Sequence, residues 1–189
     1  AVKVFPPKDS IYVGMCEIII LLAEGGSENV ERLVASKAAA FVANGKRAFV
    51  DNEKAQDVAS RATTALGAPA KTSTDTVSSK AEPAPSDEIS GVVSDMKASA
   101  DDLNCQIKGL EAIQRLASKD PPESAAAVAK AGACDCVVSA MKTFPDEIRV
   151  LARACSVINI LCTDNRETSK YFGEIGVCEI FMAAVKVFP

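Results

Sequence analysis

The sequence repeats itself, and this constrains the fold more than any local motif. Residues 1–6 and residues 184–189 both read AVKVFP, and residues 140–145 (AMKTFP) and 45–50 (GKRAFV) are weaker copies of the same phrase. The basic residue of the phrase recurs at intervals of 44, 50, 45 and 44 residues, at Lys3, Arg47, Lys97, Lys142 and Lys186. Self-similarity at such a period is typical of a solenoid of stacked helical units.

The composition fits closely packed helices and argues against two kinds of partner. Hydrophobic residues make up 48% of the chain, aromatic residues only 5%, and there is no Trp. The formal net charge is −4, and no run of Lys or Arg exceeds two, so we expect no nucleic-acid partner and no anionic membrane surface. The longest apolar stretch, residues 18–23, is too short to span a bilayer, so no membrane insertion is expected.

The apolar positions divide the chain into about four units that we expect to stack in chain order. Sliding residues 1–50 onto residues 140–189 without a gap gives nine identities and keeps the apolar positions in phase. The predicted segments are a first unit at 1–50, a long helix of an irregular unit at 51–67, a loop at 68–86, and further units at 87–144 and 145–189.

Each regular unit reads as a long helix, a short helix and a closing apolar helix. In the first unit, the spacing of apolar residues predicts helices over 9–24, 28–36 and 38–49. A Gly or Lys stands at the junction before the closing helix, as in Ile175-Gly176. The acidic pairs Asp101-Asp102 and Asp146-Glu147 precede long helices, which predicts that they cap helix N-termini.

The irregular unit is interrupted by a segment of different composition. Residues 68–86 read APAKTSTDTVSSKAEPAPS, with one Val as the only large apolar side chain. Such a segment cannot bury enough apolar surface to offset its ordering entropy, so we predict a disordered or loosely draped loop. A helical pattern resumes over residues 87–99, and residues 101–118 supply the next long helix.

The last unit resembles an armadillo repeat. The resemblance rests on the small-residue helix that ends in Asn159-Ile160-Leu161, the Asp164-Asn165-Arg166 turn, the Ile175-Gly176 junction and the closing apolar helix. It implies an all-α, right-handed α-solenoid of about four three-helix repeats, in which the long helices line the concave surface. HEAT repeats are the nearest alternative.

Armadillo proteins that carry nuclear import signals place a Trp, and four residues later an Asn, on the long helix. The aligned pairs in this chain are Cys16/Ile20, Ser60/Thr64, Leu110/Gln114 and Cys155/Asn159. Only Asn159 matches the family residue, which argues against binding of nuclear signals. The resemblance still implies a concave groove for a partner peptide or helix, and Asn159 either contacts that ligand or hydrogen-bonds a neighbouring turn. The predicted groove residues are Glu17, Ile20, Gln114, Arg153 and Asn159.

The residues do not predict an enzyme, a cofactor or a metal site. Without His, a Cys or Ser nucleophile has no ordinary base, and the Gly25-Gly26 pair reads as a turn. Cys134 and Cys136 form the closest pair among seven cysteines, but a zinc site needs two further ligands. We expect reduced, buried thiols and a cytoplasmic protein, in keeping with cytoskeletal association.

Two functions remain open. The identical hexapeptides lie 183 residues apart, so the chain reads as one period of a longer array, with raw apolar faces at both extremities and copies joined end to end. A structural rod or filament backbone that anchors other proteins follows from this interpretation. The alternative is an adaptor whose concave groove binds the peptide or helix of a partner.

Overall fold

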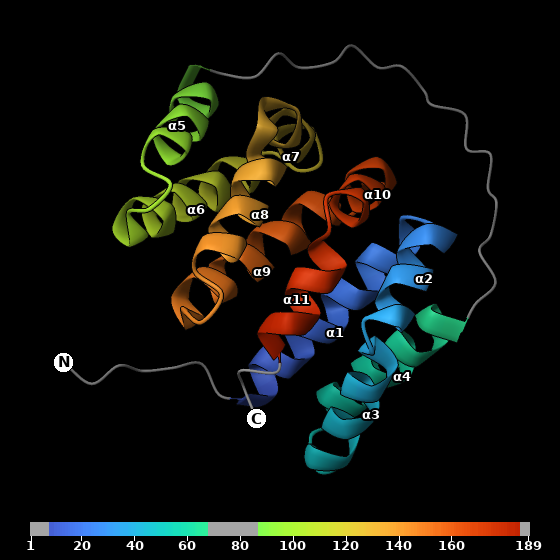
Figure 1. Cartoon of the computed structure of the whole chain (residues 1–189). Helices are drawn as coiled ribbons and strands as arrows, with labels where there is room; N and C mark the ends of the chain where they lie inside the picture. The colour runs from blue at the N-terminus through green and yellow to red at the C-terminus, as the bar shows by residue number, and fades with distance from the viewer. Residues whose placement is uncertain (1–7, 68–86, 186–189) are drawn as a thin grey trace.

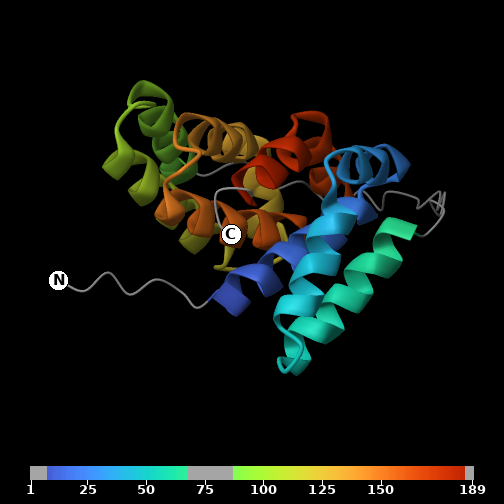
Figure 2. The ribbon, with the colours of Figure 1, turned by 60° about the horizontal axis from the view of Figure 1, so that its bottom comes forward.

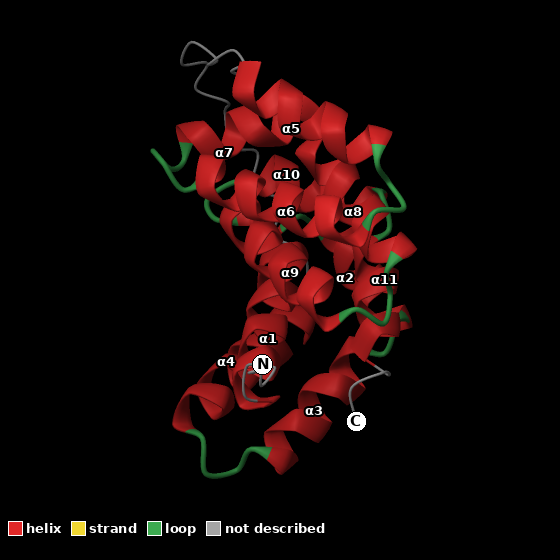
Figure 3. Ribbon diagram, turned by 90° about the vertical axis from the view of Figure 1, so that its left-hand side faces the viewer, coloured by secondary structure: helices red, strands yellow, loops and turns green. Residues whose placement is uncertain are grey.

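The computed structural model describes residues 8–67 and 87–185, and this part of the chain consists of helices joined by turns and loops, with no strand (Figure 3). The predicted loop at 68–86 lies outside the described residues. The helices of the first stretch are α1 (Lys8–Glu24), α2 (Ser27–Ala35), α3 (Ala38–Ala48) and α4 (Glu53–Gly67). Those of the second are α5 (Asp87–Ala98), α6 (Leu103–Ala117), α7 (Glu123–Val128), α8 (Cys134–Thr143), α9 (Ile148–Cys162), α10 (Arg166–Glu174) and α11 (Val177–Val185).

The turn between each short helix and its closing helix depends on one residue with left-handed backbone geometry. The φ angle is +70° at Lys37, +88° at Gly132 and +87° at Gly176. Lys37 and Gly176 directly precede the closing helices α3 and α11, and Gly132 lies two residues before the closing helix α8. Gly adopts this geometry without steric cost, whereas Lys does not. The Gly-or-Lys junction noticed in the sequence is therefore the site at which the chain reverses.

Polar side chains begin the long helices as predicted. Asp102 accepts hydrogen bonds from the backbone N–H groups of Asn104 (2.8 Å) and Cys105 (3.1 Å). Glu147 accepts one from the N–H of Arg149 at 3.4 Å. Each bond satisfies a backbone donor that has no partner within the helix. The capping role expected for these two residues is confirmed.

A glutamine at one position of the long helix fixes how it follows the preceding closing helix. Gln56 of α4 donates from Nε2 to the backbone carbonyls of Lys46 (2.6 Å) and Phe49 (3.0 Å), at the end of α3. Gln106 of α6 donates in the same way to the carbonyls of Met96 and Ser99, at the end of α5, over 2.8 and 2.9 Å. Helix α5 therefore packs against α6 through the same glutamine contact by which α3 packs against α4.

The four long helices form one row whose order differs from the chain order (Figure 1). Helix α6 packs against α9, α9 packs against α1, and α1 packs against α4. The short helix α2 packs against α10 and α11, in the layer beside the row. One continuous cluster of buried apolar side chains runs through both stretches and includes Ile19, Leu110 and Ile158.

The expected stacking in chain order is wrong. The first unit does not lie at one end of the molecule, because it packs on the last unit. Helix α4 lies at one end, and α5 and α6 lie at the other (Figures 1 and 2). Helix α4 packs against α1, α2 and α3, whereas α5 packs against α6, α8 and the turn after α7. Helices α4 and α5, which follow one another in the sequence, therefore lie at opposite ends of the molecule. The apolar faces of α9 and α10 pack against α1 and α2, which lie more than 110 residues earlier in the chain.

The expected raw apolar ends are also absent from the described residues. The exposed side of α4 carries Ser60, Arg61 and Thr64, and that of α5 carries Ser90 and Asp95. Large hydrophobic residues with high exposure occur elsewhere among the described side chains, at Val34, Val50 and Tyr171. Polar outer faces of this kind are what terminal units of a helical stack require in water.

The stretch Glu123–Thr143 is long and apolar enough, by length and composition, to cross a membrane. It consists of α7 and α8 with the kink at Gly132 between them, and 56% of its most apolar window is buried inside the protein. Its apolar side chains, among them Val128, Val137 and Met141, belong to the core cluster.

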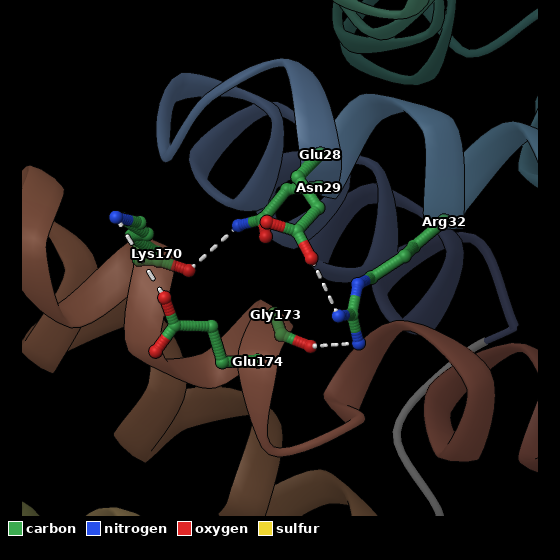
Figure 4. Close-up of polar contacts among 7 residues, drawn as sticks. Glu28, Asn29, Arg32, Lys170, Gly173 and Glu174 are labelled. Atoms are coloured by element: carbon green, nitrogen blue, oxygen red, sulfur yellow. Dashed lines mark hydrogen bonds and ion pairs between the residues drawn. The ribbon is translucent and has the colours of Figure 1, made fainter.

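The two stretches meet at a buried amide (Figure 4). Asn29 of α2 is 2% exposed and donates from Nδ2 to the carbonyls of Leu22 and Ser169, both at 2.8 Å. Arg32 donates to the carbonyl of Gly173 at 3.1 Å and to the carboxylate of Glu28 at 2.8 Å. A Cβ on Gly173 would overlap the Asn29 side chain, so the close approach of α2 to α10 requires Gly there.

Gly173→Ala is expected to lower the free energy of unfolding by about 2–4 kcal/mol. The new methyl group either displaces the Asn29 amide from its carbonyl partners or forces α2 away from α10. Gly91→Ala is the matched control, because nothing lies within 4 Å of a Cβ built on that helical glycine. The control should gain about 0.5–1 kcal/mol. Urea unfolding of both variants measures the difference, and equal stabilities would contradict the assigned close approach.

Lys37→Gly is expected to raise the free energy of unfolding by about 0.5–1 kcal/mol. The substitution removes the strain of a left-handed Lys, partly offset by the larger entropy of Gly in the unfolded chain. The reverse test is Gly176→Ala, which should cost about 1 kcal/mol, since a Cβ there meets only Glu179 at 3.6 Å and the loss reports backbone strain alone. Thermal denaturation monitored by circular dichroism distinguishes the two directions.

Candidate functional site

Polar side chains connect neighbouring long helices on one face of the row. Arg153 of α9 forms an ion pair with Glu111 of α6, with Nη2 and Oε1 2.9 Å apart. Asn159, further along α9, donates from Nδ2 to Oε2 of Glu17 on α1 at 3.4 Å. Oε1 of Glu17 lies 4.0 Å from Nζ of Lys54 on α4. These five residues define what we call the long-helix face.

The contacts follow from the helical period. Residues 153 and 159 lie on two edges of one side of α9, with Ser156 between them, so one reaches toward α6 and the other toward α1. Each contact joins two adjacent helices of the row α6–α9–α1–α4. The face therefore presents acidic and basic side chains in alternation across the row.

The side chains of this face remain accessible to a ligand. Those of Arg153 and Glu111 are 46% and 47% exposed, and those of Lys54 and Glu17 are 72% and 34% exposed. Exposed ion pairs of this kind stabilise a fold by at most about 1 kcal/mol each. Their side chains can exchange partners with a bound peptide at small cost to the fold.

The structure brings together three of the five predicted site residues. Glu17 and Asn159 are in direct contact, and Arg153 lies on the same helix as Asn159. Ile20 is half-buried and packs against the core beside Glu17. Gln114 is half-buried on α6, one turn from Glu111. Asn159 hydrogen-bonds the side chain of Glu17 on the neighbouring long helix, and not the neighbouring turn that was one of its two expected partners.

Two residues of this face escaped the sequence analysis. Glu111 and Lys54 contact predicted residues, but they did not occupy the aligned positions of the armadillo pattern. Helical spacing could have identified Glu111, because it lies three residues before Gln114 on the same side of α6. Recognising Lys54 required knowledge that α4 lies beside α1.

Five of the seven cysteines are poorly suited to nucleophilic chemistry. Burial raises the pKa of the Cys16 thiol to about 11, and burial is also the largest cause that raises the pKa of four other thiols to about 12, those of Cys134, Cys155, Cys162 and Cys178. The thiolate is the reactive form, so these groups are inert near neutral pH. Among the described residues, no three His, Cys, Asp or Glu side chains gather as metal ligands do.

Comparison with known proteins gives no relative: no family model, no curated protein and no solved structure matches this chain.

The buried thiols predict a loss of stability in alkali. An unfolded thiol titrates near pH 9, whereas these folded thiols titrate near 11–12, so the unfolded chain loses protons first as the pH rises. Their stabilisation is complete below pH 9 and is lost between pH 9 and 12, by at most about 1.4 kcal/mol per thiol and pH unit.

Urea unfolding under reducing conditions at pH 7, 9 and 10 measures this loss. A Cys134→Ala/Cys162→Ala variant serves as the comparison, because it lacks two of the perturbed thiols and should show a shallower decline above pH 9. An unfolding free energy that stays constant from pH 7 to pH 10 would contradict the assignment.

Proposed function

We propose that the chain is a non-enzymatic scaffold of armadillo-like repeats, an α-solenoid that binds a partner protein on its long-helix face. The observation that carries the proposal is the set of polar contacts across α6, α9, α1 and α4, which places Glu111, Arg153, Asn159, Glu17 and Lys54 on one accessible face. The repeated Gln contacts and left-handed junctions support a common three-helix unit.

The chemistry of the face favours an extended peptide of mixed charge. The Asn159 amide offers both a donor and an acceptor, which suits a peptide backbone, while Arg153 and Lys54 suit acidic side chains and Glu111 and Glu17 suit basic ones. A peptide crossing the row would meet these groups in succession. The binding surface then belongs to the scaffold as a whole, not to any single helix.

A rod or filament backbone remains a second candidate, because the AVKVFP phrase occurs both before α1 and from the end of α11 onward. Extension of such a rod through apolar end faces receives no support, since the outer sides of α4 and α5 are polar. A rod of this protein would instead consist of modules joined in series. Each module would still present its own long-helix face to partners.

Selection of 16-residue peptides from a displayed random library on the intact protein tests the binding proposal. Peptides selected on the wild type should lose at least tenfold in affinity for an Arg153→Ala/Asn159→Ala variant. Lys170→Ala is the matched control, since it removes an exposed cation that pairs with Glu174 on α10 and is not one of the five residues of the long-helix face. Fluorescence anisotropy gives the dissociation constants, and circular dichroism checks that the variants stay folded.

Peptides that bind the double variant as tightly as the wild type, or a library that yields no binder, would refute the long-helix face as the binding site.

A further inference from the structure

Helices α9, α10 and α11 contact the first stretch, residues 8–67, in the way that consecutive units of a repeat protein contact each other. Helix α1 packs on α9 as α9 packs on α6 and as α4 packs on α1. Polar groups cross the junction at three places: Asn29 to the Ser169 carbonyl, Arg32 to the Gly173 carbonyl, and Asn159 to Glu17. In space, the units of this chain therefore follow one another in the order 87–185 and then 8–67; we call this arrangement the module.

The sequence at the junction agrees with this order. Helix α11 runs into the AVKVFP of residues 184–189, and the identical AVKVFP of residues 1–6 runs into α1. Joining residue 189 to residue 7 would reproduce the local sequence on both sides without any new residue. In Figures 1 and 2, α11 ends on the side of the molecule where α1 begins.

The covalent connection between the two stretches runs the other way, from α4 to α5. These helices lie at opposite ends of the row, at least three interhelical spacings apart, which amounts to about 24–30 Å. Residues 68–86 bridge this separation with 19 residues, whose fully extended reach from 67 to 87 is about 70 Å. The connection is therefore long enough for the two stretches of one chain to meet.

We propose that α9, α10 and α11 form a docking surface for residues 8–67 of a second copy of this chain. The surface is the same one that the chain's own first stretch occupies, so docking within a chain and between chains use identical contacts. Because the surface of one copy receives a different surface of the next, the contact is heterologous and can continue in series. Each module in such a series combines 87–185 of one copy with 8–67 of another.

Shortening the connection between α4 and α5 distinguishes docking within one chain from docking between two chains. Removal of residues 70–84 leaves four residues between α4 and α5, with a reach of about 17 Å, so the stretches of one chain can no longer meet across the row. The shortened chain should form dimers or longer species, seen by light scattering at micromolar concentration, and keep the helical circular dichroism of the full chain. The full chain should be monomeric when dilute.

A permuted chain, with residues 87–189 followed directly by residues 7–67, controls for folding. It should be a folded monomer that melts no lower than the full chain, because its covalent order matches the order in space. Gly173→Ala in the shortened chain should weaken association at least tenfold, whereas Gly91→Ala should leave it unchanged.

Four results would overturn the proposal. A shortened chain that is folded and monomeric, or that loses its helical signal while the permuted chain keeps it, excludes docking between copies. A permuted chain that does not fold excludes the inferred order of the module. Association of the shortened chain that responds equally to Gly173→Ala and Gly91→Ala shows that the species form through another surface. None of these results depends on peptide binding at the long-helix face.

Discussion

The fold depends on the contact that α1 and α2 make with α9 and α10. This junction joins two stretches whose apolar faces would otherwise be open to water, and it completes one continuous core. Its centre is the buried Asn29 amide, which satisfies the carbonyls of Leu22 and Ser169 where Gly173 allows α2 to approach. A buried amide without such partners would cost roughly 1–3 kcal/mol, so the polar groups fix the register that apolar packing alone leaves loose.

The junction also explains why the order in space can differ from the order along the chain. The entropy lost in closing a loop grows only as the logarithm of its length, so a connection of 19 residues adds little more than a short turn would. The apolar seam decides which helices are neighbours, and residues 68–86 need only span the distance. Because α4 and α5 carry polar outer sides, the row ends in water at both of them without a further unit.

Local sequence determines the helices but not their neighbours. Apolar spacing placed α2, which spans Ser27–Ala35, and α3, which spans Ala38–Ala48, within a residue of their expected bounds. The caps at Asp102 and Glu147 followed from residue type. The same spacing tells which side of α1 is apolar, but several other helices offer an equivalent side. The choice of α9 rests on Asn29 and Gly173, whose fit is a matter of shape that no periodicity encodes. The repeated hexapeptide AVKVFP did indicate the neighbour of α1, since it implies that α1 follows directly after α11.

The long-helix face also depends on the contact of α1 and α2 with α9 and α10. Glu17 and Asn159 were both predicted as site residues, yet their contact exists only because α1 lies beside α9. A stack in chain order would leave Asn159 at an extremity, without Glu17 and Lys54. A ligand that touches both α9 and α1 binds the docked arrangement and not the separated stretches, so it stabilises docking by an amount that grows with its concentration relative to its dissociation constant. Partner binding and the association of the two stretches, whether within one chain or between copies, are therefore thermodynamically coupled through the same pair of helices.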